Sequence, residues 1–185
     1  MANILVPLAQ GCEELEAITI TDLLTRAGFN VVTAGLDGQA VVASRGMTLL
    51  PKTTLDDVLQ ASFDMIVLPG GLPGADHLNN DARIHQLLAR LNSENKFIAA
   101  ICAAPKVLAR AGLLKNRAAT SFPGAIVEED MTGVRYQETP VVVDGNIITS
   151  RGPGTAMDFA LQLIELLAGK AKRDEVEGPL QRPAA

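Results

Sequence analysis

Cys102 is the side chain in this sequence best suited to covalent chemistry. It stands between an apolar strand-like run, Phe97–Ile101, and a helix-like segment, Ala103–Arg110, with no residues left over for a loop. Such a sharp strand-to-helix turn is a nucleophile elbow, which presents its central residue at the edge of a sheet. Because Pro105 suits the first turn of a helix, we expect the thiol to face the positive helix end, which lowers its pKa. The alternative is a buried structural cysteine, since cysteine is among the most buried residue types.

Glu16 is an acidic side chain that the helical pattern places toward the core. At 100° per residue it shares a face with four apolar residues, Ile20, Leu23, Leu24 and Ala27. Glu14 falls on the opposite face, where we expect it to be solvated or peripheral. A carboxyl group on the inward face must be paired, protonated or used, so Glu16 is the candidate proton-handling partner of Cys102. The plainer interpretation is an acid favoured by the helix dipole.

Backbone N–H groups near Cys102 could stabilise a developing negative charge. Gly70 and Gly71 follow the buried strand Asp64–Leu68, and glycine lets backbone N–H groups approach a ligand closely. The N–H groups of Gly71 and of Ala103, the residue after the nucleophile, would together form an oxyanion hole. A tight turn explains the two glycines equally well.

The remaining reactive side chains carry weaker signals. Arg26 and Arg45 are the basic candidates for the site, although charged residues of this kind are usually solvated. His77 follows the glycine-rich loop and could border a pocket. Cys12 could act as a resolving thiol, but a plain loop cysteine is the default interpretation. No spacing of Cys, His, Asp and Glu residues predicts a metal site.

The composition limits the classes of function. Of the 185 residues 48% are apolar, only 3% are aromatic, and the net charge is −5. These values argue against a basic nucleic-acid surface and against an aromatic platform for stacked bases. No apolar run reaches the length of a membrane span, and the first residues lack the pattern of a secretory signal. Two cysteines are too few for a disulfide scaffold, so we expect the reducing cytoplasm.

The elements that must position these side chains alternate between short strand-like and longer helical runs, which indicates βαβ units around a parallel sheet. The predicted buried strands are Ile4–Ala9, Val31–Leu36, Asp64–Leu68 and Phe97–Ile101. The predicted helices are Glu13–Ala27, Leu55–Gln60, Ala82–Asn92 and Thr155–Ala168. One or two short extra strands fall in Gln39–Leu50, and Asp144-Gly145 predicts an antiparallel hairpin over Val141–Thr149. We expect one α/β domain over residues 1–185, in which residues 170–185 form a polar tail with a frayed end.

Several separate motifs, in order along nearly the whole chain, resemble those of the ThiJ/PfpI superfamily and most closely its deglycase branch. The motifs are Gly11–Glu16, Ser44–Gly46, Val67–Gly71, Ala99–Pro105 and Thr149–Thr155. The resemblance implies a flavodoxin-like three-layer sandwich with a mostly parallel central sheet, an added antiparallel hairpin and assembly into a homodimer. It also implies that Arg26 and Arg45 lie near the pocket and the dimer contact.

The same resemblance implies roles for the site residues. Cys102 would be the nucleophile, the Glu16 carboxyl would hydrogen-bond to its sulfur, and the N–H groups of Gly71 and Ala103 would hold an oxyanion. The family is associated with conversion of methylglyoxal to lactate without a cofactor, with repair of early glycation adducts and with protection against oxidative stress. This chain departs from the pattern at Phe122, because many members carry His before a Pro at this place.

Two functions from different classes follow. In the first, Cys102 adds to the aldehyde carbon of a 2-oxoaldehyde or glycation adduct, and Glu16 moves protons in place of a triad base. A triad hydrolase such as a protease fits less well, since no Cys–His pair is visible, and we expect slower chemistry than in members with His. In the second, the protein is an oxidative-stress sensor or chaperone in which peroxide converts Cys102 to a sulfinic acid.

Overall fold

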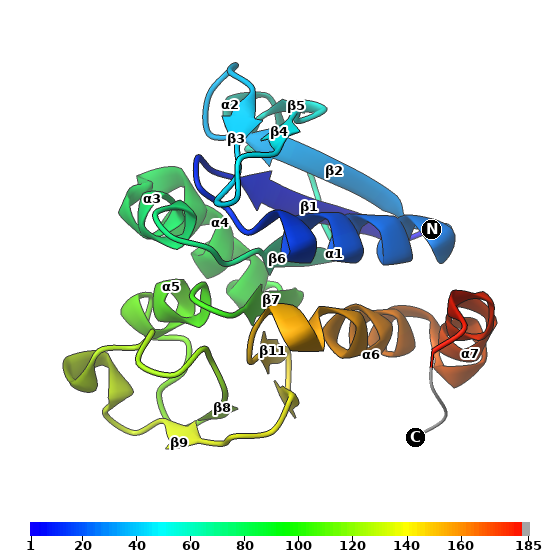
Figure 1. Ribbon diagram of the computed structural model, residues 1–185. Helices are drawn as coiled ribbons and strands as arrows, with labels where there is room; N and C mark the ends of the chain where they lie inside the picture. The colour runs from blue at the N-terminus through cyan, green and yellow to red at the C-terminus, as the bar shows by residue number, and fades with distance from the viewer. Residues whose placement is uncertain (183–185) are drawn as a thin grey trace.

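The computed structural model describes residues 1–182, which form a seven-stranded sheet between two layers of helices (Figure 1). The strand order is β10-β11-β7-β6-β1-β2-β5. The strands are β1 (Asn3–Leu8), β2 (Asn30–Gly35), β5 (Thr53–Thr54), β6 (Met65–Leu68), β7 (Phe97–Ile101), β10 (Val141–Asp144) and β11 (Ile147–Ser150). The inner order β2-β1-β6-β7-β11 is that of a flavodoxin-like doubly wound sheet.

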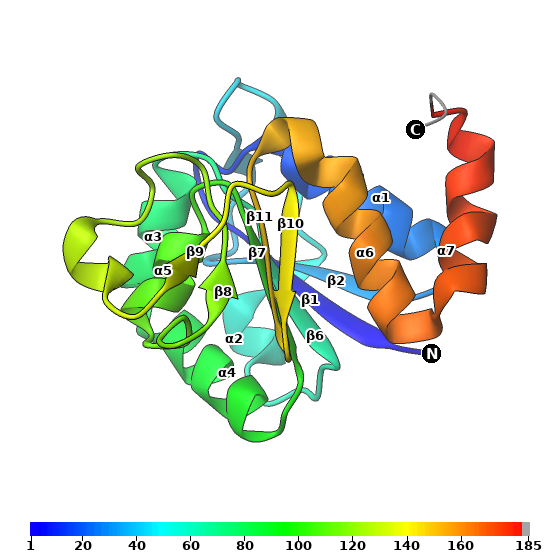
Figure 2. The ribbon, with the colours of Figure 1, turned by 90° about the horizontal axis from the view of Figure 1, so that it is seen from below.

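The helices divide between the two faces of the sheet. They are α1 (Glu14–Arg26), α2 (Leu55–Val58), α3 (Gly74–Asn80), α4 (Ala82–Ser93), α5 (Pro105–Arg110), α6 (Ala156–Ala168) and α7 (Lys170–Glu177). Helices α1 and α6 cover one face, and α2, α4 and α5 cover the other (Figures 1 and 2). Alternate strand residues enter the two cores: Val6 and Val67 pack under α1 and α6, whereas Leu5 and Ile66 pack on the opposite side. The two-residue period of the strands thus separates two apolar cores.

The parallel register brings the ends of three strands to one edge of the sheet. Leu68 of β6 lies opposite Ala100 of β7, and Ser150 of β11 lies opposite Ile101. The loops that follow these strands therefore leave the sheet side by side. Helix α1 begins at the same edge, only a few residues after β1 ends. This edge is where ligands bind in open α/β sheets.

The predicted α/β class and the predicted hairpin are confirmed, with one refinement. Strands β10 and β11 pair antiparallel, but β11 runs parallel to β7, so β10 alone opposes the other strands of the sheet. The expected short strands in Gln39–Leu50 are β3 (Val41–Val42) and β4 (Thr48–Leu49). A further small pair, β8 (Ala118–Ala119) and β9 (Arg135–Tyr136), was not predicted. These two-residue strands are too short to show a period in sequence.

Two helices were also missed. Helix α3 follows Pro69–Pro73, whose glycines and prolines indicate a loop. The helix itself has only seven residues, which is too short to show a clear helical spacing of apolar residues. Helix α7 lies in the segment that was expected to be a polar tail. Its polar side chains act as ion-pair partners rather than as core: Arg173 pairs with Glu165 of α6 at 3.3 Å. The expected frayed end falls on residues 183–185, which lie outside the described part of the chain.

No helix within residues 1–182 is both long and apolar enough to cross a membrane.

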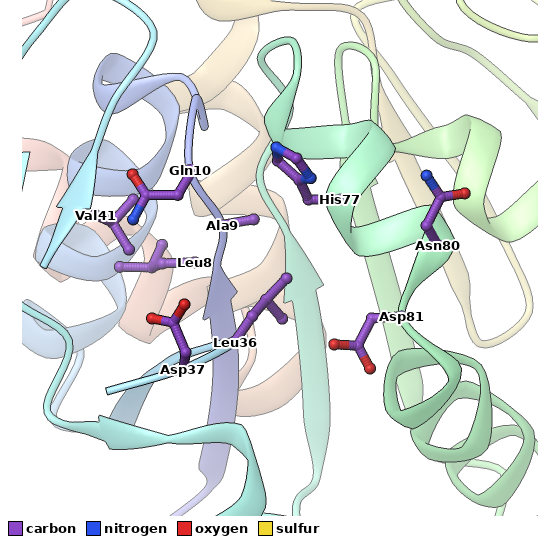
Figure 3. Close-up of a pocket in the computed structure, with 9 residues that line it drawn as sticks. All are labelled: Leu8, Ala9, Gln10, Leu36, Asp37, Val41, His77, Asn80 and Asp81. Atoms are coloured by element: carbon purple, nitrogen blue, oxygen red, sulfur yellow. The ribbon is translucent and has the colours of Figure 1, made fainter. Parts of the chain in front are cut away.

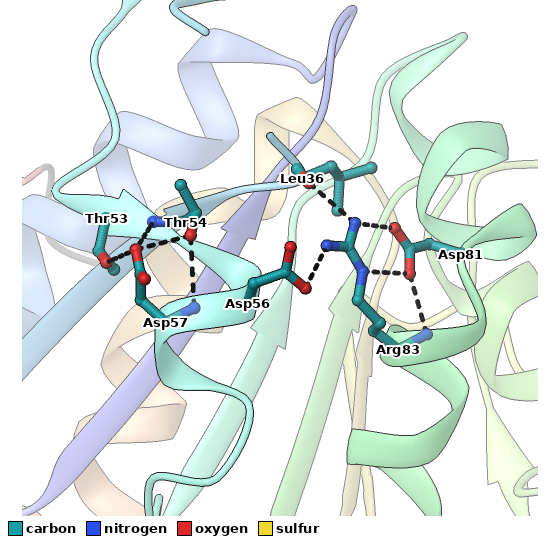
Figure 4. Close-up of polar contacts among 7 residues, drawn as sticks. All are labelled: Leu36, Thr53, Thr54, Asp56, Asp57, Asp81 and Arg83. Carbon is teal, nitrogen blue, oxygen red and sulfur yellow. Dashed lines mark hydrogen bonds and ion pairs between the residues drawn. The ribbon is translucent and has the colours of Figure 1, made fainter. Parts of the chain in front are cut away.

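Arg83 connects three elements near the carboxyl end of β2 (Figure 4). Its guanidinium group donates to both Asp81 oxygens, to Asp56 Oδ1 at 2.7 Å and to the Leu36 carbonyl oxygen at 2.8 Å. The arginine side chain is only 26% exposed. Hydrogen bonds to charged groups are stronger than neutral ones, and partly buried partners are costly to leave unpaired. The network thus ties α2, the end of β2 and the start of α4 together.

We expect Arg83→Gln to lower the free energy of unfolding by about 2 kcal/mol, because it leaves the Leu36 carbonyl and the Asp81 carboxylate without their partner. The matched control is Arg26→Gln, which removes an exposed ion pair with Asp22. Exposed pairs contribute about 0 to 1 kcal/mol, so this change should be small. Urea denaturation of both variants measures the difference, and equal losses would show that the Arg83 network adds nothing beyond a surface pair.

Candidate active site

Cys102 occupies the sharp turn that links β7 to α5. Its backbone is in the left-handed region, with φ of +62°, a conformation that costs energy in residues other than glycine. Hydrogen bonds hold the turn: the Cys102 N–H donates to the Ser150 carbonyl at 2.9 Å, and the Phe122 N–H donates to the Cys102 carbonyl at 2.8 Å. Neighbouring β11 and the Phe122 segment therefore support the strained residue from both sides. The side chain is 8% exposed.

Glycine is required beside this turn. A Cβ atom on Gly70 would lie 2.7 Å from the Cys102 Cβ and 2.9 Å from the Ala103 nitrogen, which is closer than real contacts allow. Gly71 has φ of +87°, and a Cβ atom there would lie 2.3 Å from the Glu13 nitrogen. The loop after β6 therefore packs its backbone directly against both the elbow and the start of α1. The backbone N–H groups of Gly71 and Ala103 lower the pKa of Cys102 and so favour its thiolate.

The Glu16 carboxyl group is fully buried beneath the thiol. Its exposure is 0%, and its Oε2 accepts a hydrogen bond from the Gly70 N–H at 2.8 Å. Its other oxygen, Oε1, is buried and has no hydrogen-bond partner within residues 1–182. The carboxyl also interacts with the Cys102 side chain. A protonated carboxyl could donate from its unpartnered oxygen to the sulfur, which would satisfy both groups.

Burial dominates the protonation of this pair. It raises the pKa of Glu16 to about 7, against the opposing hydrogen bonds from Gly70 and Cys102. Burial, together with the negative charge of Glu16, raises the pKa of Cys102 to about 12. Two groups in such contact titrate as a pair, so one proton leaves near neutral pH and the second only in strong alkali. The pair then carries a single negative charge, shared between oxygen and sulfur.

The expectation of a lowered thiol pKa was wrong. The N–H groups of Gly71 and Ala103 do favour the thiolate, but they are outweighed by burial and by the adjacent carboxylate. Helix α5 has only six residues, from Pro105 to Arg110, so few aligned peptide dipoles contribute at its amino end. The thiolate therefore depends on the protonation state of Glu16 more than on the helix.

Glu14 is not solvated, contrary to the prediction. It is buried, and its carboxylate accepts hydrogen bonds from the backbone N–H groups of Arg45 at 3.0 Å and Met47 at 3.3 Å, and from the Ser44 hydroxyl. Burial would raise its pKa, yet these donors lower the pKa below its usual value. Ser44 also donates to Glu13 at 2.7 Å. The Ser44–Met47 loop therefore covers Glu14 at the start of the face of α1 that the helical pattern assigned to solvent.

The two predicted arginines do not meet at the thiol. The backbone N–H of Arg45 donates a hydrogen bond to the Glu14 carboxylate, and the Arg45 side chain is exposed. Arg26 lies at the last turn of α1, paired with Asp22. Ten residues separate it from Glu16, which is about 15 Å along a helix. Within one chain, Arg26 therefore lies far from Cys102, and its proposed place in the pocket has no support from this geometry.

Cys12 is a second buried thiol rather than an exposed one. Its exposure is 1%, and burial and the nearby Glu14 raise its pKa to about 11. A resolving thiol needs thiolate character and access, so this setting favours the structural interpretation. Within residues 1–182 no cluster of three His, Cys, Asp or Glu side chains is placed to hold a metal ion.

A separate crevice lies at the carboxyl ends of β1 and β2 (Figure 3). Its volume is about 320 Å³, and its lining includes Leu8, Leu36, His77 and Asp81. His77 does border a pocket, as the sequence suggested. The lining contains no cysteine, serine or lysine, and Cys102 is not part of it. We therefore place covalent chemistry at the elbow and not in this crevice.

Comparison with known proteins places the chain in a family. Residues 2–166 match the DJ-1/PfpI family. The chain belongs to this family. It is 46% identical to Protein dj-1beta of Drosophila melanogaster over 93% of this chain and 92% of that protein. The crystal structure of Drosophila melanogaster DJ-1beta superposes with a TM-score of 0.93, covers 99% of both chains and shares 44% identity.

Two further relatives of this DJ-1/PfpI family member differ in length and name. The chain is 40% identical to Protein DJ-1 homolog A of Arabidopsis thaliana over 96% of its own residues, but it spans only 46% of that protein. It is 37% identical to the Glutathione-independent glyoxalase DJR-1.2 of Caenorhabditis elegans, over 97% of this chain and 95% of that protein.

Sequence reasoning missed Glu13 and Ser44 in this family member. Glu13 precedes α1, is buried and contributes its negative charge to the raised pKa of Glu16. Its partner Ser44 lies 31 residues away. The run Glu13-Glu14-Leu15-Glu16 was a usable signal, because three closely spaced acids near a helix start require donors from elsewhere in the chain.

The raised pKa of Glu16 predicts a pH-dependent stability. The carboxyl has a pKa of about 7 in the folded state against an ordinary value of 4.5. Its neutral form therefore stabilises the folded state fully below pH 4.5, and this contribution is lost as the pH rises through 7. Between pH 5 and pH 8 we expect the wild type to lose about 2 to 3 kcal/mol more than Glu16→Gln.

Chemical denaturation of both proteins at the two pH values measures this difference. The control is Glu94→Gln, which changes an exposed glutamate at the end of α4; it should follow the wild type. If Glu16→Gln also follows the wild type, the carboxyl is already ionised at pH 5 and the shared-proton description of the pair is wrong.

Proposed function

We propose that this protein is a stress-protective enzyme in which Cys102 attacks the aldehyde carbon of small 2-oxoaldehydes or early glycation adducts. The observation that carries the proposal is the fully buried Glu16 carboxyl in contact with the thiol of the elbow. A carboxyl whose pKa lies near 7 can both accept and donate a proton at neutral pH. This is the property that an enzyme without a histidine base requires.

The chemistry can be written with a 2-oxoaldehyde as the substrate. The Cys102 sulfur forms a bond to the aldehyde carbon, and the carbonyl oxygen takes up a proton to give a hemithioacetal. The proton on the former aldehyde carbon then moves to the neighbouring ketone carbon through an enediol, which leaves a thioester on Cys102. Water cleaves the carbon–sulfur bond, releases a 2-hydroxy acid and restores the thiol. In sum, one 2-oxoaldehyde and one water give one 2-hydroxy acid. The reaction has no net oxidation or reduction, so it needs no cofactor.

The site residues take separate parts in this scheme. Glu16 accepts the thiol proton and relays protons between the two substrate carbons. We assign the oxyanion hole to the N–H groups of Gly71 and Ala103, which lower the pKa of Cys102 and would stabilise the oxygen that becomes negative during addition. For Arg45 we propose only peripheral contact with substrate, because its side chain is exposed. The name of the Caenorhabditis elegans relative, a glutathione-independent glyoxalase, supports this reaction class.

The competing function is an oxidative-stress sensor or chaperone in which Cys102 is oxidised to a sulfinic acid. Oxidation by peroxide requires the thiolate, and the raised pKa of Cys102 disfavours it. The reducing cytoplasm, the location that we propose, would also keep Cys102 as a thiol between turnovers. The Glu16 carboxyl, which can exchange a proton near neutral pH, and the name of the Caenorhabditis elegans relative support the enzyme better.

We expect Cys102→Ser to abolish turnover of methylglyoxal and Glu16→Gln to lower kcat/KM by about 100-fold, since one proton-transfer group typically contributes this much. The matched control is Cys12→Ala, which removes the other buried thiol and should keep the wild-type rate per folded molecule. Release of lactate measures the reaction. A Cys102→Ser protein that consumes methylglyoxal at the wild-type rate would refute the proposal.

Intact mass spectrometry after mild peroxide treatment distinguishes the competing function. A sensor should gain two oxygen atoms on Cys102 and should lose this response in Glu16→Gln. Negligible methylglyoxal turnover together with this mass change would favour the sensor over the enzyme.

We further propose that the chain forms a homodimer through the outer face of α1. Leu15 and Ile18 lie three residues apart on this helix and are 49% and 41% exposed. Met47, also exposed, lies beside them because its backbone N–H is bonded to Glu14. Apolar side chains gathered in this way are typical of an interface. In the proposed dimer, the outer face of α1 in one copy packs against the same face of the second copy. This is twofold symmetry, the commonest symmetry of soluble oligomers.

We expect Ile18→Lys to convert the dimer to a monomer, because a charge on each copy would be buried against the other. Val143→Lys, at a comparably exposed apolar residue on the edge strand β10, is the matched control and should remain dimeric. Sedimentation equilibrium at micromolar concentration measures the mass of both. A monomeric wild type would contradict the proposal.

A further inference from the structure

Phe122 is an exposed aromatic residue whose backbone is hydrogen-bonded to Cys102. It is 50% exposed, whereas Phe63 and Phe159 are buried and Phe29 and Phe97 are half-buried. A large apolar side chain left in contact with water beside a reactive group is available to contact a ligand.

The position of Phe122 is fixed by its backbone. Its N–H donates to the Cys102 carbonyl at 2.8 Å, and its own carbonyl accepts from the Ala125 N–H at 3.0 Å and from the Ser121 hydroxyl at 2.9 Å. Ser121 is held in turn by the Tyr136 hydroxyl, which donates to its carbonyl at 3.0 Å. The residue thus belongs to a rigid segment and not to a free loop, which reduces the entropy cost of using it in binding.

The ring lies over the start of the α6 connection. A Cβ atom built on Gly152 would be 3.5 Å from the Phe122 Cδ2 atom, which is an ordinary contact distance, so the ring lies against Gly152. Gly152 follows Ser150, whose carbonyl accepts the Cys102 N–H. The ring is therefore anchored beside the elbow, on the same edge of the sheet as the thiol.

A phenylalanine cannot carry a proton, so its contribution must be apolar contact. Cys102 is only 8% exposed, and a slim terminal aldehyde can reach its sulfur more easily than an internal carbonyl can. Glu16 and the loop after β6 fill the inner side of the site, so the rest of such a substrate must extend outward, where Phe122 stands. An aromatic or bulky apolar substituent would cover the ring and remove apolar surface from water.

We propose that Phe122 is a specificity-determining residue that selects 2-oxoaldehydes with an aromatic or large apolar substituent on the ketone carbon. This inference rests on the proposed function, because it names the substrate class of the same site. The pairing of two aromatic rings contributes binding free energy beyond that of the apolar area it buries. The preference for a phenyl over a methyl substituent should therefore fall about 5-fold when the Phe122 ring is removed.

Turnover of phenylglyoxal and methylglyoxal by the wild type and Phe122→Ala tests the proposal. The quantity is the ratio of the two kcat/KM values, which cancels any general loss of activity. We expect Phe122→Ala to lower the ratio about 5-fold and Phe122→Leu to lie between. Val143→Ala, at an exposed apolar residue on β10, is the matched control and should keep the wild-type ratio. A ratio unchanged in Phe122→Ala would overturn the inference, and Phe122→Leu decides it if the alanine variant does not fold.

A second measurement separates this inference from the proposed function. Phenacyl chloride and chloroacetone are α-chloroketones that differ only in a phenyl or methyl group, and each alkylates a thiol by forming a carbon–sulfur bond as chloride leaves. The ratio of their rates at Cys102, followed by intact mass, needs no turnover. If the wild type converts neither oxoaldehyde, the proposed function fails, and the alkylation ratio in Phe122→Ala still decides the role of the ring. A ratio equal to that of the wild type would refute it.

Discussion

The site depends on one interaction, the contact between the buried carboxyl of Glu16 and the thiol of Cys102. Neither group is solvated well enough to hold a full negative charge alone, and together they hold one. The first proton therefore leaves the pair near neutral pH. The second proton stays on the pair, bound to the Glu16 oxygen or to the Cys102 sulfur. In the proposed mechanism, Cys102 would obtain its proton acceptor in this way, from a carboxyl that burial has made weakly acidic.

The fold supplies the conditions for this contact. The parallel register of β6, β7 and β11 brings three loops to one edge, and α1 starts at the same edge with Glu16 on its inner face. Gly70 lets the backbone approach so closely that a single N–H both anchors the carboxyl and borders the elbow. The strain of a left-handed Cys102 is balanced by hydrogen bonds from two neighbouring segments. Strain of this kind persists only where the surroundings determine the backbone.

The sequence predicted what depends on local patterns and missed what depends on distant partners. The alternation of strands and helices, and the helical face of Glu16, both follow from spacing within one element. Glu14 shows the opposite case. Its hydrogen-bond donors come from the Ser44–Met47 loop, about 30 residues away, and a helical pattern takes no account of residues outside the helix. The thiol pKa failed for a similar reason: the helix end could be recognised in sequence, but the extent of burial beside Glu16 could not. Arg26 was carried over from a resemblance, although its ten-residue separation from Glu16 on one predicted helix already places the two residues about 15 Å apart.

The burial of Cys102 has a consequence for its redox partners. A mixed disulfide forms when one sulfur approaches another in line with the bond that breaks, which requires room for a second sulfur and its carbon chain. A cysteine exposed by only 8% gives little such room. Peptide and protein thiols therefore reach its sulfur more slowly than small electrophiles do. In the proposed enzyme, the same burial would keep abundant cellular thiols from trapping Cys102.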